Sequence, residues 1–337
     1  MLLVAGHPEL DGHDSGPGHP ERAARLPAAM RGLSDAGLND AIVRLEPRRA
    51  TLGELSRVHP LPYLEALRAF CEAGGGQLDP DTSAVPGSWD TTLLAAGGVL
   101  AAVEALAAGE GEAAFVLARP PGHHALADQP MGFCLVNNVA VAAAVLAERG
   151  EKVAVVDWDV HHGNGTQDIF WNHPRVLYVS THQWPLYPGT GRAEETGGPA
   201  ARGTTLNVPL PAGATGDVLL AAFEGVVAEA VDSFGPTWVL VSAGFDAHRA
   251  DTLAGLELTA GDFAALAARV RRFAPVAGRV VAVLEGGYDL DALRLSVGAT
   301  AAALLGERYV PEPASSGGPG AEVLERVRRA QEEATAR

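Results

Sequence analysis

The chain has 337 residues, of which 47% are hydrophobic and 20% charged, and it contains 40 glycines and 23 prolines. This composition excludes a chain dominated by disorder and suits a globular α/β protein with many loops. There are 41 acidic and 25 basic residues, and the net charge is −16. That balance disfavours nonspecific nucleic-acid binding and attracts cationic molecules, although charge alone favours the simpler explanation of an acidic surface that only keeps the protein soluble.

Two cysteines, Cys71 and Cys134, cannot form a disulfide framework, and no Cys-x-x-Cys pair indicates a thiolate metal site. No basic segment precedes the first apolar residues, and apolar runs such as 139–147 are too short to cross a bilayer. We therefore expect a cytoplasmic protein without a membrane partner. A homo-oligomer is compatible with the sequence.

Apolar runs and Ala-rich segments alternate along the chain. The apolar runs, rich in Val, Ile and Leu, predict buried parallel strands at residues 41–45, 114–118, 153–158, 176–180, 238–242 and 280–284. The Ala-rich segments predict packing helices at residues 88–108, 138–149, 216–231, 259–273 and 290–305. This alternation is typical of an α/β fold with a mostly parallel central sheet.

The domain organisation follows from the same pattern. We expect one catalytic domain over residues 1–305, with residues 306–337 as a C-terminal linker and surface helix, because the low-complexity segment 314–320 precedes a charged helical pattern. Residues 74–88 predict a long functional loop. Polar, Gly-rich segments follow the expected strands, at residues 119–124, 157–165, 180–182, 243–248 and 285–289. Ligands of open parallel sheets bind at this carboxyl edge, so the chemistry is expected there.

A candidate metal site follows two of these strands. Asp157, Asp159 and His161 alternate, so they share one face if the chain stays extended. Asp246 follows another buried strand, and together Asp159, His161 and Asp246 form a three-ligand set with an open position, which is the pattern of catalytic zinc. The alternative is that these aspartates cap helices or turns.

Two adjacent histidines, His123 and His124, follow a rigid Pro-Pro-Gly segment. Histidine transfers protons near neutral pH, and Asp157 and Asn164 are candidate partners for the far ring nitrogens. A charged partner for one ring and a neutral partner for the other favours a proton on His123 and leaves His124 to accept one from a water at the metal site. The alternative is a solvated, idle pair of surface histidines.

Tyr288 lies in the segment EGGYD, where two glycines let the backbone approach the expected site. Its phenol is a suitable hydrogen-bond donor to a developing oxyanion. The alternative is a core or interface tyrosine whose hydroxyl is satisfied elsewhere.

Several motifs in this order closely resemble the histone deacetylase family, most of all its class II branch and bacterial relatives. They are HPERAARL (19–26), RPPGHHA (119–125), GFCLVNNVAVAA (132–143), DWDVHHGNGTQDIF (157–170), YPGTG (187–191), AGFDAH (243–248) and EGGYDL (285–290). The resemblance covers roughly residues 5–304. It implies the arginase-deacetylase fold, with a central eight-stranded parallel sheet flanked by helices.

The resemblance also implies residue roles. Zinc is expected at Asp159, His161 and Asp246, proton transfer at His123 and His124 supported by Asp157 and Asn164, and polarisation of the acyl carbonyl by Tyr288. The residues expected to contact substrate or line the site are Gly132, Phe133 and Tyr187 in an acyl-lysine channel, Asp81 at the rim, Leu253 in place of an acidic gatekeeper, and Arg22 in a cavity beneath the metal. Structural potassium is expected at Asp157 and Ser180 with backbone oxygens of Asp159, His161 and Thr181, and at carbonyls of Phe170, His173 and Val176.

The sequence therefore predicts a zinc-dependent deacetylase that hydrolyses the amide of an acetylated or short-acylated lysine side chain. Two alternatives stay open. One is an amidohydrolase acting on an acetylpolyamine or another small acylated amine, although Leu253 weakens a strict polyamine preference. The other is a binding module that has kept an acyl-lysine pocket without catalysis.

Overall fold

The computed structural model describes residues 1–336, and a single eight-stranded sheet runs through its centre. The strands lie in the order β2-β1-β5-β10-β9-β6-β7-β8, and every neighbouring pair is parallel. Their bounds are β1 Leu2–Ala5, β2 Ile42–Leu45, β5 Ala113–Val116, β6 Val153–Asp157, β7 Val176–Gln183, β8 Thr205–Leu210, β9 Trp238–Ala243 and β10 Val280–Leu284. The expected parallel α/β sheet is confirmed.

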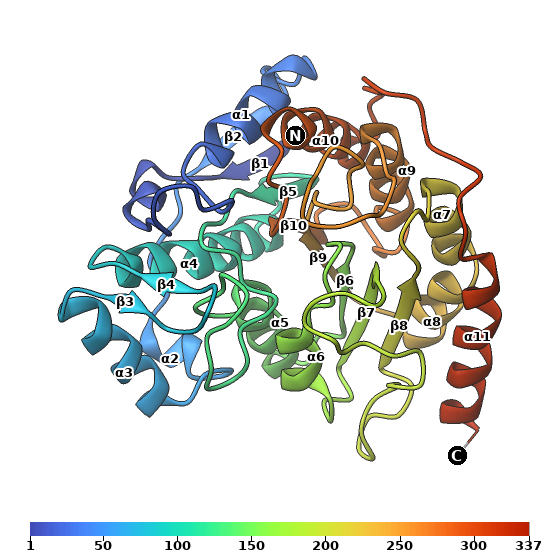
Figure 1. Ribbon diagram of the computed structural model, residues 1–337, viewed down its shortest axis with the longest axis horizontal. Helices are drawn as coiled ribbons and strands as arrows, with labels where there is room; N and C mark the ends of the chain where they lie inside the picture. The colour runs from blue at the N-terminus through green and yellow to red at the C-terminus, as the bar shows by residue number, and fades with distance from the viewer. Residues whose placement is uncertain (337) are drawn as a thin grey trace.

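Helices cover both faces of the sheet, which explains why its inner strands are buried and mostly apolar. In Figure 1, α1 (Arg25–Asp35), α10 (Leu290–Leu305), α9 (Ala260–Val270) and α7 (Gly216–Glu224) lie on one side of the strands, and α4 (Ser88–Ala107) and α5 (Asn138–Glu148) on the other. The remaining helices are α2 Leu52–Leu55, α3 Leu61–Glu72, α6 Asn164–Phe170, α8 Val226–Phe234 and α11 Ala321–Thr335. A strand such as β6 is therefore buried at every residue.

The structure adds helices α1, α2, α3 and α6 to those predicted from the sequence, and it differs from the prediction in three further places. It adds strands β1 and β8, whose short runs did not stand out from their surroundings. The helix expected over 216–231 is two helices, because Gly225 adopts a non-helical conformation between α7 and α8. Within the loop 74–88, the short strands β3 (Gly76–Gln77) and β4 (Ser83–Ala84) pair antiparallel.

Helix α11 packs along strand β8, at one end of the sheet. Val323 and Val327 are buried, and Gln331 Nε2 donates a 2.5 Å hydrogen bond to the carbonyl of Thr205 in β8. The C-terminal segment thus covers an edge strand, whose unpaired backbone groups otherwise invite pairing with another chain. The domain boundary near residue 305 stays a prediction.

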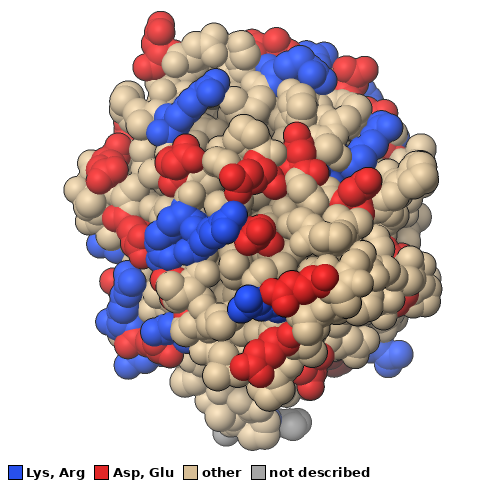
Figure 2. Space-filling view, turned by 90° about the vertical axis from the view of Figure 1, so that its left-hand side faces the viewer, with Lys and Arg blue, Asp and Glu red and all other residues tan. Residues whose placement is uncertain are grey.

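Helix α4 is the one helix among residues 1–336 that is long and apolar enough to cross a membrane, by length and composition only. In its most apolar window, 78% of the residues are buried inside the molecule, as in the core helix of an α/β fold. On the face shown in Figure 2, acidic and basic side chains are interspersed, and no large patch of one sign covers it. On this face the net negative charge is therefore not concentrated in one place.

The sheet order brings distant segments to one place. Strands β5, β10, β9 and β6 are consecutive neighbours in the middle of the sheet. Because all four run parallel, the segments that follow them leave from the same edge. These segments carry the His-His pair, Tyr288, Asp246 and the Asp159–His161 pair, so residues spread over about half of the chain can share one site.

Helices α1 and α10 cross at Gly32 and Gly298, where a Cβ on Gly32 would overlap the backbone carbonyl of Arg294. We expect Gly32→Ala to lower the free energy of unfolding by about 1–3 kcal/mol, the usual cost of overpacking. Gly53→Ala is the matched control, because Gly53 is exposed in α2 and its Cβ would make only an ordinary van der Waals contact, with Thr51 Oγ1. Denaturant unfolding measures both variants, and equal unfolding midpoints for the two would contradict this view of the helix crossing.

Candidate active site

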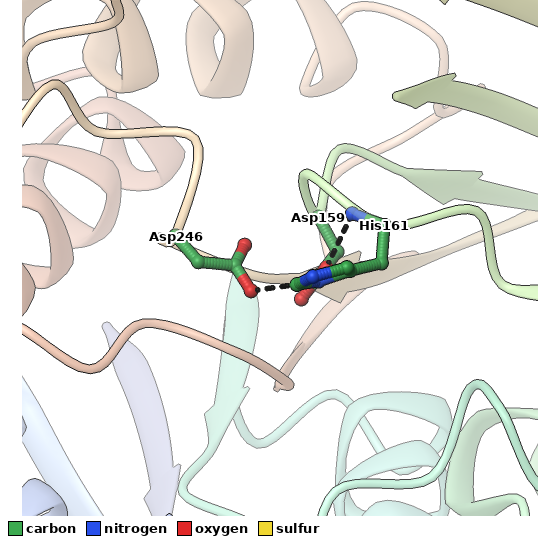
Figure 3. A group of neighbouring side chains, drawn as sticks. All are labelled: Asp159, His161 and Asp246. Carbon is green, nitrogen blue, oxygen red and sulfur yellow. Dashed lines mark hydrogen bonds and ion pairs between the residues drawn. The ribbon is translucent and has the colours of Figure 1, made fainter. Parts of the chain in front are cut away.

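Asp159, His161 and Asp246 meet beyond the ends of β6 and β9 (Figure 3). One ligand atom from each lies within 4.8 Å of the others. His161 Nδ1 faces both carboxylates, at 3.1 Å from Asp159 Oδ1 and 3.2 Å from Asp246 Oδ2. The structure therefore brings together the three residues that the sequence proposes as metal ligands.

The sequence predicted that an extended strand aligns Asp157, Asp159 and His161. That prediction is wrong, because β6 ends at Asp157. Instead, two successive turns aim these side chains. Asp157 Oδ1 accepts a 3.1 Å hydrogen bond from the Asp159 backbone N–H, and Asp159 Oδ1 accepts one of 2.9 Å from that of His161. Aspartate often closes such turns onto the backbone two residues on. Asp157 thereby points away from the metal-ligand group and toward His123.

The group has the chemistry of a cation site. Asp159 and Asp246 are almost fully buried, and burying two carboxylates so close together is costly unless a positive charge compensates them. Asp246 Oδ2 is buried and accepts no well-directed hydrogen bond from the described residues. Burial and the neighbouring charge of Asp159 raise the pKa of Asp246 to about 6.

The pKa of His161 shows the same imbalance of charge. Burial lowers this pKa, but the carboxylates of Asp159 and Asp246 outweigh burial and raise it to about 10. Two carboxylates thus attract a positive charge to the place where a metal would replace the His161 proton. The residues present fit a divalent ion.

The two expected partners hold the histidine pair. His123 Nδ1 donates to Asp157 Oδ2 at 3.0 Å, and His124 Nδ1 donates to Asn164 Oδ1 at 2.8 Å. Both histidines are buried, with ring centroids 4.0 Å apart, so the idle surface pair is excluded. With its Nδ1 hydrogen given to the amide, neutral His124 keeps a lone pair on Nε2.

The two histidines differ in proton affinity. Burial lowers the pKa of His123, but the charges of Asp157 and Asp159 outweigh it and raise the pKa to about 10. For His124, burial and then the charge of His123 hold the pKa well below 6.5. The surroundings therefore favour a proton on His123 and disfavour a charge on His124, its neighbour.

Tyr288 approaches the metal group on a loop that only glycine permits. A Cβ on Gly286 would overlap Asp246 Oδ2, and the Gly286 N–H donates to Asp159 Oδ2 at 2.8 Å. The Tyr288 ring stands edge-on to Phe133, with centroids 5.8 Å apart. Burial, followed by the charge of Asp246, raises the pKa of Tyr288 well above 10, so its phenol keeps its proton.

Gly132 and Tyr187 lie against His124, and Phe133 lies between the rings of His19 and Tyr288. The Tyr187 ring lies 5.2 Å from that of His124, Gly132 packs against the same imidazole, and Tyr187 is 39% exposed. Asp81 belongs to this surface, because the Phe133 N–H donates to Thr82 Oγ1, which donates to Asp81 Oδ1. The long loop 74–88 thus reaches the entrance side of the site.

The expectation for Arg22 is wrong, because this side chain is exposed and does not line an internal cavity. The buried arginine of the same motif is Arg25, one helical turn further on. Its guanidinium lies 5.0 Å from the centre of the Tyr288 ring, and its Nε donates to the Gly287 carbonyl at 2.7 Å. The residues after Arg22 form a turn before α1, and sequence spacing alone did not show which arginine points inward.

Two further buried groups were missed. Arg119 is fully buried and donates to both carboxylate oxygens of Glu21, at 2.5 and 2.9 Å. Glu285 Oε2 accepts hydrogen bonds from the Gly122 and His123 backbone N–H groups, at 2.6 and 3.2 Å. The available sequence signal was the same for Arg119 and Glu285: each is a charged residue at the start of a motif that carries site residues.

Comparison with known proteins agrees with this geometry. Residues 19–304 match the histone deacetylase domain family. The chain belongs to the histone deacetylase family. It is 42% identical over 293 residues to a probable deacetylase of Archaeoglobus fulgidus, covering 86% of this chain and 81% of that protein. It is 43% identical over 291 residues to a histone deacetylase-like amidohydrolase of Pseudomonas aeruginosa, covering 85% and 73%.

The fold agrees with the same family. The crystal structure of the HDA15 HD domain superposes with a TM-score of 0.90 at 35% sequence identity, covering 98% of this chain and 96% of that one. The predicted arginase-deacetylase fold is thereby confirmed, as is the predicted family.

In this histone deacetylase family member, the residues proposed for potassium lie on β6 and β7, in the loop after β6 and around the end of α6. Asp157, the last residue of β6, is the register partner of Ser180 in β7, and Thr181 follows Ser180 in the same strand. The carbonyls of Phe170 and His173 each accept one hydrogen bond, from His173 and Val176. A carbonyl oxygen has a second lone pair, so these positions keep capacity for a cation.

Glu21 forms buried ion pairs with Arg25 and Arg119, and these pairs predict how the stability of the protein depends on pH. Burial raises the pKa of Glu21, but the hydrogen bonds and charge of Arg119, followed by the charge of Arg25, outweigh it and hold the pKa at about 2, below the ordinary 4.5. The stabilisation is therefore complete above pH 4.5 and is lost as the pH falls toward 2. Glu21→Gln should lower the free energy of unfolding at pH 7 by about 3–5 kcal/mol, and this difference from the wild type should shrink below pH 4.5.

Urea unfolding at several pH values measures this difference. Glu72→Gln is the control, since Glu72 forms an exposed pair with Arg68 within α3 and should change stability by less than about 1 kcal/mol. The ion-pair explanation would be disproved if the difference in unfolding free energy between the wild type and Glu21→Gln stayed constant from pH 7 down to the lowest pH at which the protein folds.

Proposed function

We propose that the chain is a zinc-dependent deacetylase that hydrolyses the amide of an acetylated or short-acylated lysine side chain to a carboxylate and a free amine. The observation that carries the proposal is the grouping of Asp159, His161 and Asp246 beside two buried histidines. The pKa of one, His123, is raised, and that of the other, His124, is lowered. The family to which the chain belongs supports the hydrolysis of acylated amines.

The donor set of two carboxylates and one imidazole supports zinc as the ion at Asp159, His161 and Asp246. When bound, zinc supplies Lewis acidity toward the amide oxygen and lowers the pKa of water toward about 7. The three protein ligands leave room for substrate and water, as in other catalytic sites.

The two histidines carry the proton. His124, neutral and with a free Nε2 lone pair, accepts a proton from the attacking water, whose oxygen forms the new bond to the acyl carbon. The resulting imidazolium gives that proton to the amide nitrogen as the carbon–nitrogen bond breaks. His123, already charged through Asp157, keeps its proton and stabilises the negative charge that develops nearby.

Tyr288 binds the acyl oxygen in this reaction. Its protonated phenol is a hydrogen-bond donor, and such donors stabilise an oxyanion more than the ground-state carbonyl. The ring of Phe133 beside Tyr288 and the ring of Tyr187 beside His124 suit the aliphatic stem of an acylated lysine.

The rim favours acyl-lysine over a polyamine. Leu253 is 37% exposed and apolar at the position where polyamine-selective relatives tend to place an acidic gatekeeper, whereas Asp81 offers one carboxylate to a substrate backbone. We also propose structural potassium at the positions described above and a cytosolic location, which the two free, buried cysteines support.

Metal dependence and substrate class can be tested together. The protein is stripped with a chelator, reloaded with defined zinc and given acetyl-lysine peptides, longer acyl-lysine peptides and acetylated polyamines. We expect acetate release from acetyl-lysine peptides to be lost on chelation and restored by zinc. His161→Ala should not recover with zinc, because it removes one of the three ligands.

The outcomes separate the alternatives. A strong preference for acetylated polyamines would replace lysine with a small amine as the substrate. Tight binding of acyl-lysine peptide without release of acetate from the zinc-loaded protein would instead indicate a binding module and overturn the hydrolase proposal.

Replacing Tyr288 with phenylalanine removes only the hydroxyl and keeps the ring beside Phe133 and Arg25. We expect kcat to fall about 10²–10³-fold with little change in KM, as for other oxyanion donors. Tyr309→Phe is the control, since Tyr309 packs against Gly298 at the α1–α10 crossing. Steady-state kinetics measure both variants, and an unchanged kcat for Tyr288→Phe would remove the phenol from the mechanism.

A further inference from the structure

Asp251, in the loop that follows β9, has an unusual environment for a carboxylate. It is 6% exposed, and its side chain accepts hydrogen bonds from three backbone N–H groups. Oδ2 accepts from Tyr288 at 2.6 Å and from Asp289 at 3.2 Å, and Oδ1 accepts from Leu253 at 3.1 Å. Asp251 lies in the same loop as the proposed metal ligand Asp246. Its side chain thus links this loop, including Leu253, to the loop that carries Tyr288.

Asp251 forms no ion pair with a side chain among residues 1–336. Burying a carboxylate is costly, and here the three backbone donors offset that cost. Hydrogen bonds to a charged acceptor are short and directional, so they fix the donors in space as well as stabilising the charge.

The segment that carries Tyr288 needs such an anchor. Two glycines precede Tyr288, and Gly287 has a φ of +117°, so the backbone has little intrinsic preference that would fix the side chain. On the amino-terminal side, the Gly286 N–H is bound to Asp159 and the Gly287 carbonyl to Arg25. At and after Tyr288, the N–H groups of Tyr288 and Asp289 are both held by Asp251.

Helix α10 begins directly after this point. Asp289 is its N-cap, and Asp289 Oδ1 accepts from the Ala292 N–H at 2.8 Å. Asp251 therefore holds the last two residues before a rigid helix, and the position of the phenol depends on where the Tyr288 backbone enters that helix.

We propose that Asp251 is a positioning residue that sets the Tyr288 hydroxyl against the acyl oxygen and ties this position to the Leu253 rim. The proposal rests on the proposed function, because it acts through Tyr288 in amide hydrolysis. Asp251 touches neither substrate nor metal. Its effect reaches the reaction through the backbone of Tyr288.

The test is a double-mutant cycle between Asp251 and Tyr288 with the zinc-loaded protein and an acetyl-lysine peptide. Asp251→Ala should lower kcat by about 10²-fold, the scale of a displacement of about 1 Å in a reacting group. KM should change by less than about threefold, because truncation at Asp251 leaves the contacts of bound substrate in place. In the Tyr288→Phe background, Asp251→Ala should lower kcat by less than about threefold, since no hydroxyl is left to misplace.

Asp251→Asn gives a graded result. An amide keeps one oxygen acceptor for Tyr288 and Asp289 but turns a donor toward the Leu253 N–H, so its kcat should lie between the wild type and Asp251→Ala. Asp262→Asn is the matched control: Asp262 is 3% exposed and accepts backbone hydrogen bonds from Thr259 and Ser315, at the start of α9. It should lower the unfolding midpoint and leave kcat unchanged.

The outcomes distinguish this inference from the proposed function. Wild-type protein that releases no acetate would refute the proposed function itself. An active wild type with an unchanged kcat for Asp251→Ala, or with equal losses in both Tyr288 backgrounds, would refute the role of Asp251 alone. If Asp251→Ala does not fold, Asp251→Asn carries the same cycle, and additive losses there would equally overturn the proposal.

Discussion

The compensation of buried charge at one edge of the sheet is the constraint on which the site depends. Asp159 and Asp246 are buried together, and Asp157 and Glu285 lie close by and are fully buried. Each carboxylate needs a partner, and these partners are His161, His123 and the backbone N–H groups of neighbouring loops. The excess of negative charge makes the centre a place for a cation and gives His123 and His124 different proton affinities.

The sheet makes this concentration of charge possible. Four neighbouring parallel strands, β5, β10, β9 and β6, each deliver one part of the site from their carboxyl ends. The loops then bind one another directly: Gly286 to Asp159, Val160 to Asp246, and Gly122 to Glu285. Because polar groups of each loop complete those of the next, the site is a continuous hydrogen-bonded layer on an apolar core.

Much of this arrangement could be predicted from sequence. Apolar runs marked the inner strands, and residue type with spacing predicted which three residues would meet as candidate metal ligands and which would partner the histidines. Local geometry could not be predicted in the same way. Asp159 and His161 converge through turns where an extended strand was expected, and Arg25 is buried where Arg22 was expected. Strands β1 and β8 and the break at Gly225 depend on tertiary packing, which short runs of residues do not encode.

Leu253 contributes its backbone N–H to Asp251 and leaves its side chain exposed. Every amino acid except proline carries that same donor. Evolution can therefore exchange the side chain at this rim position, apolar for acidic or large for small, without breaking the bond that secures the loop. Divergent selectivity among related enzymes can arise in this way by single codon changes while the inherited reaction centre stays intact.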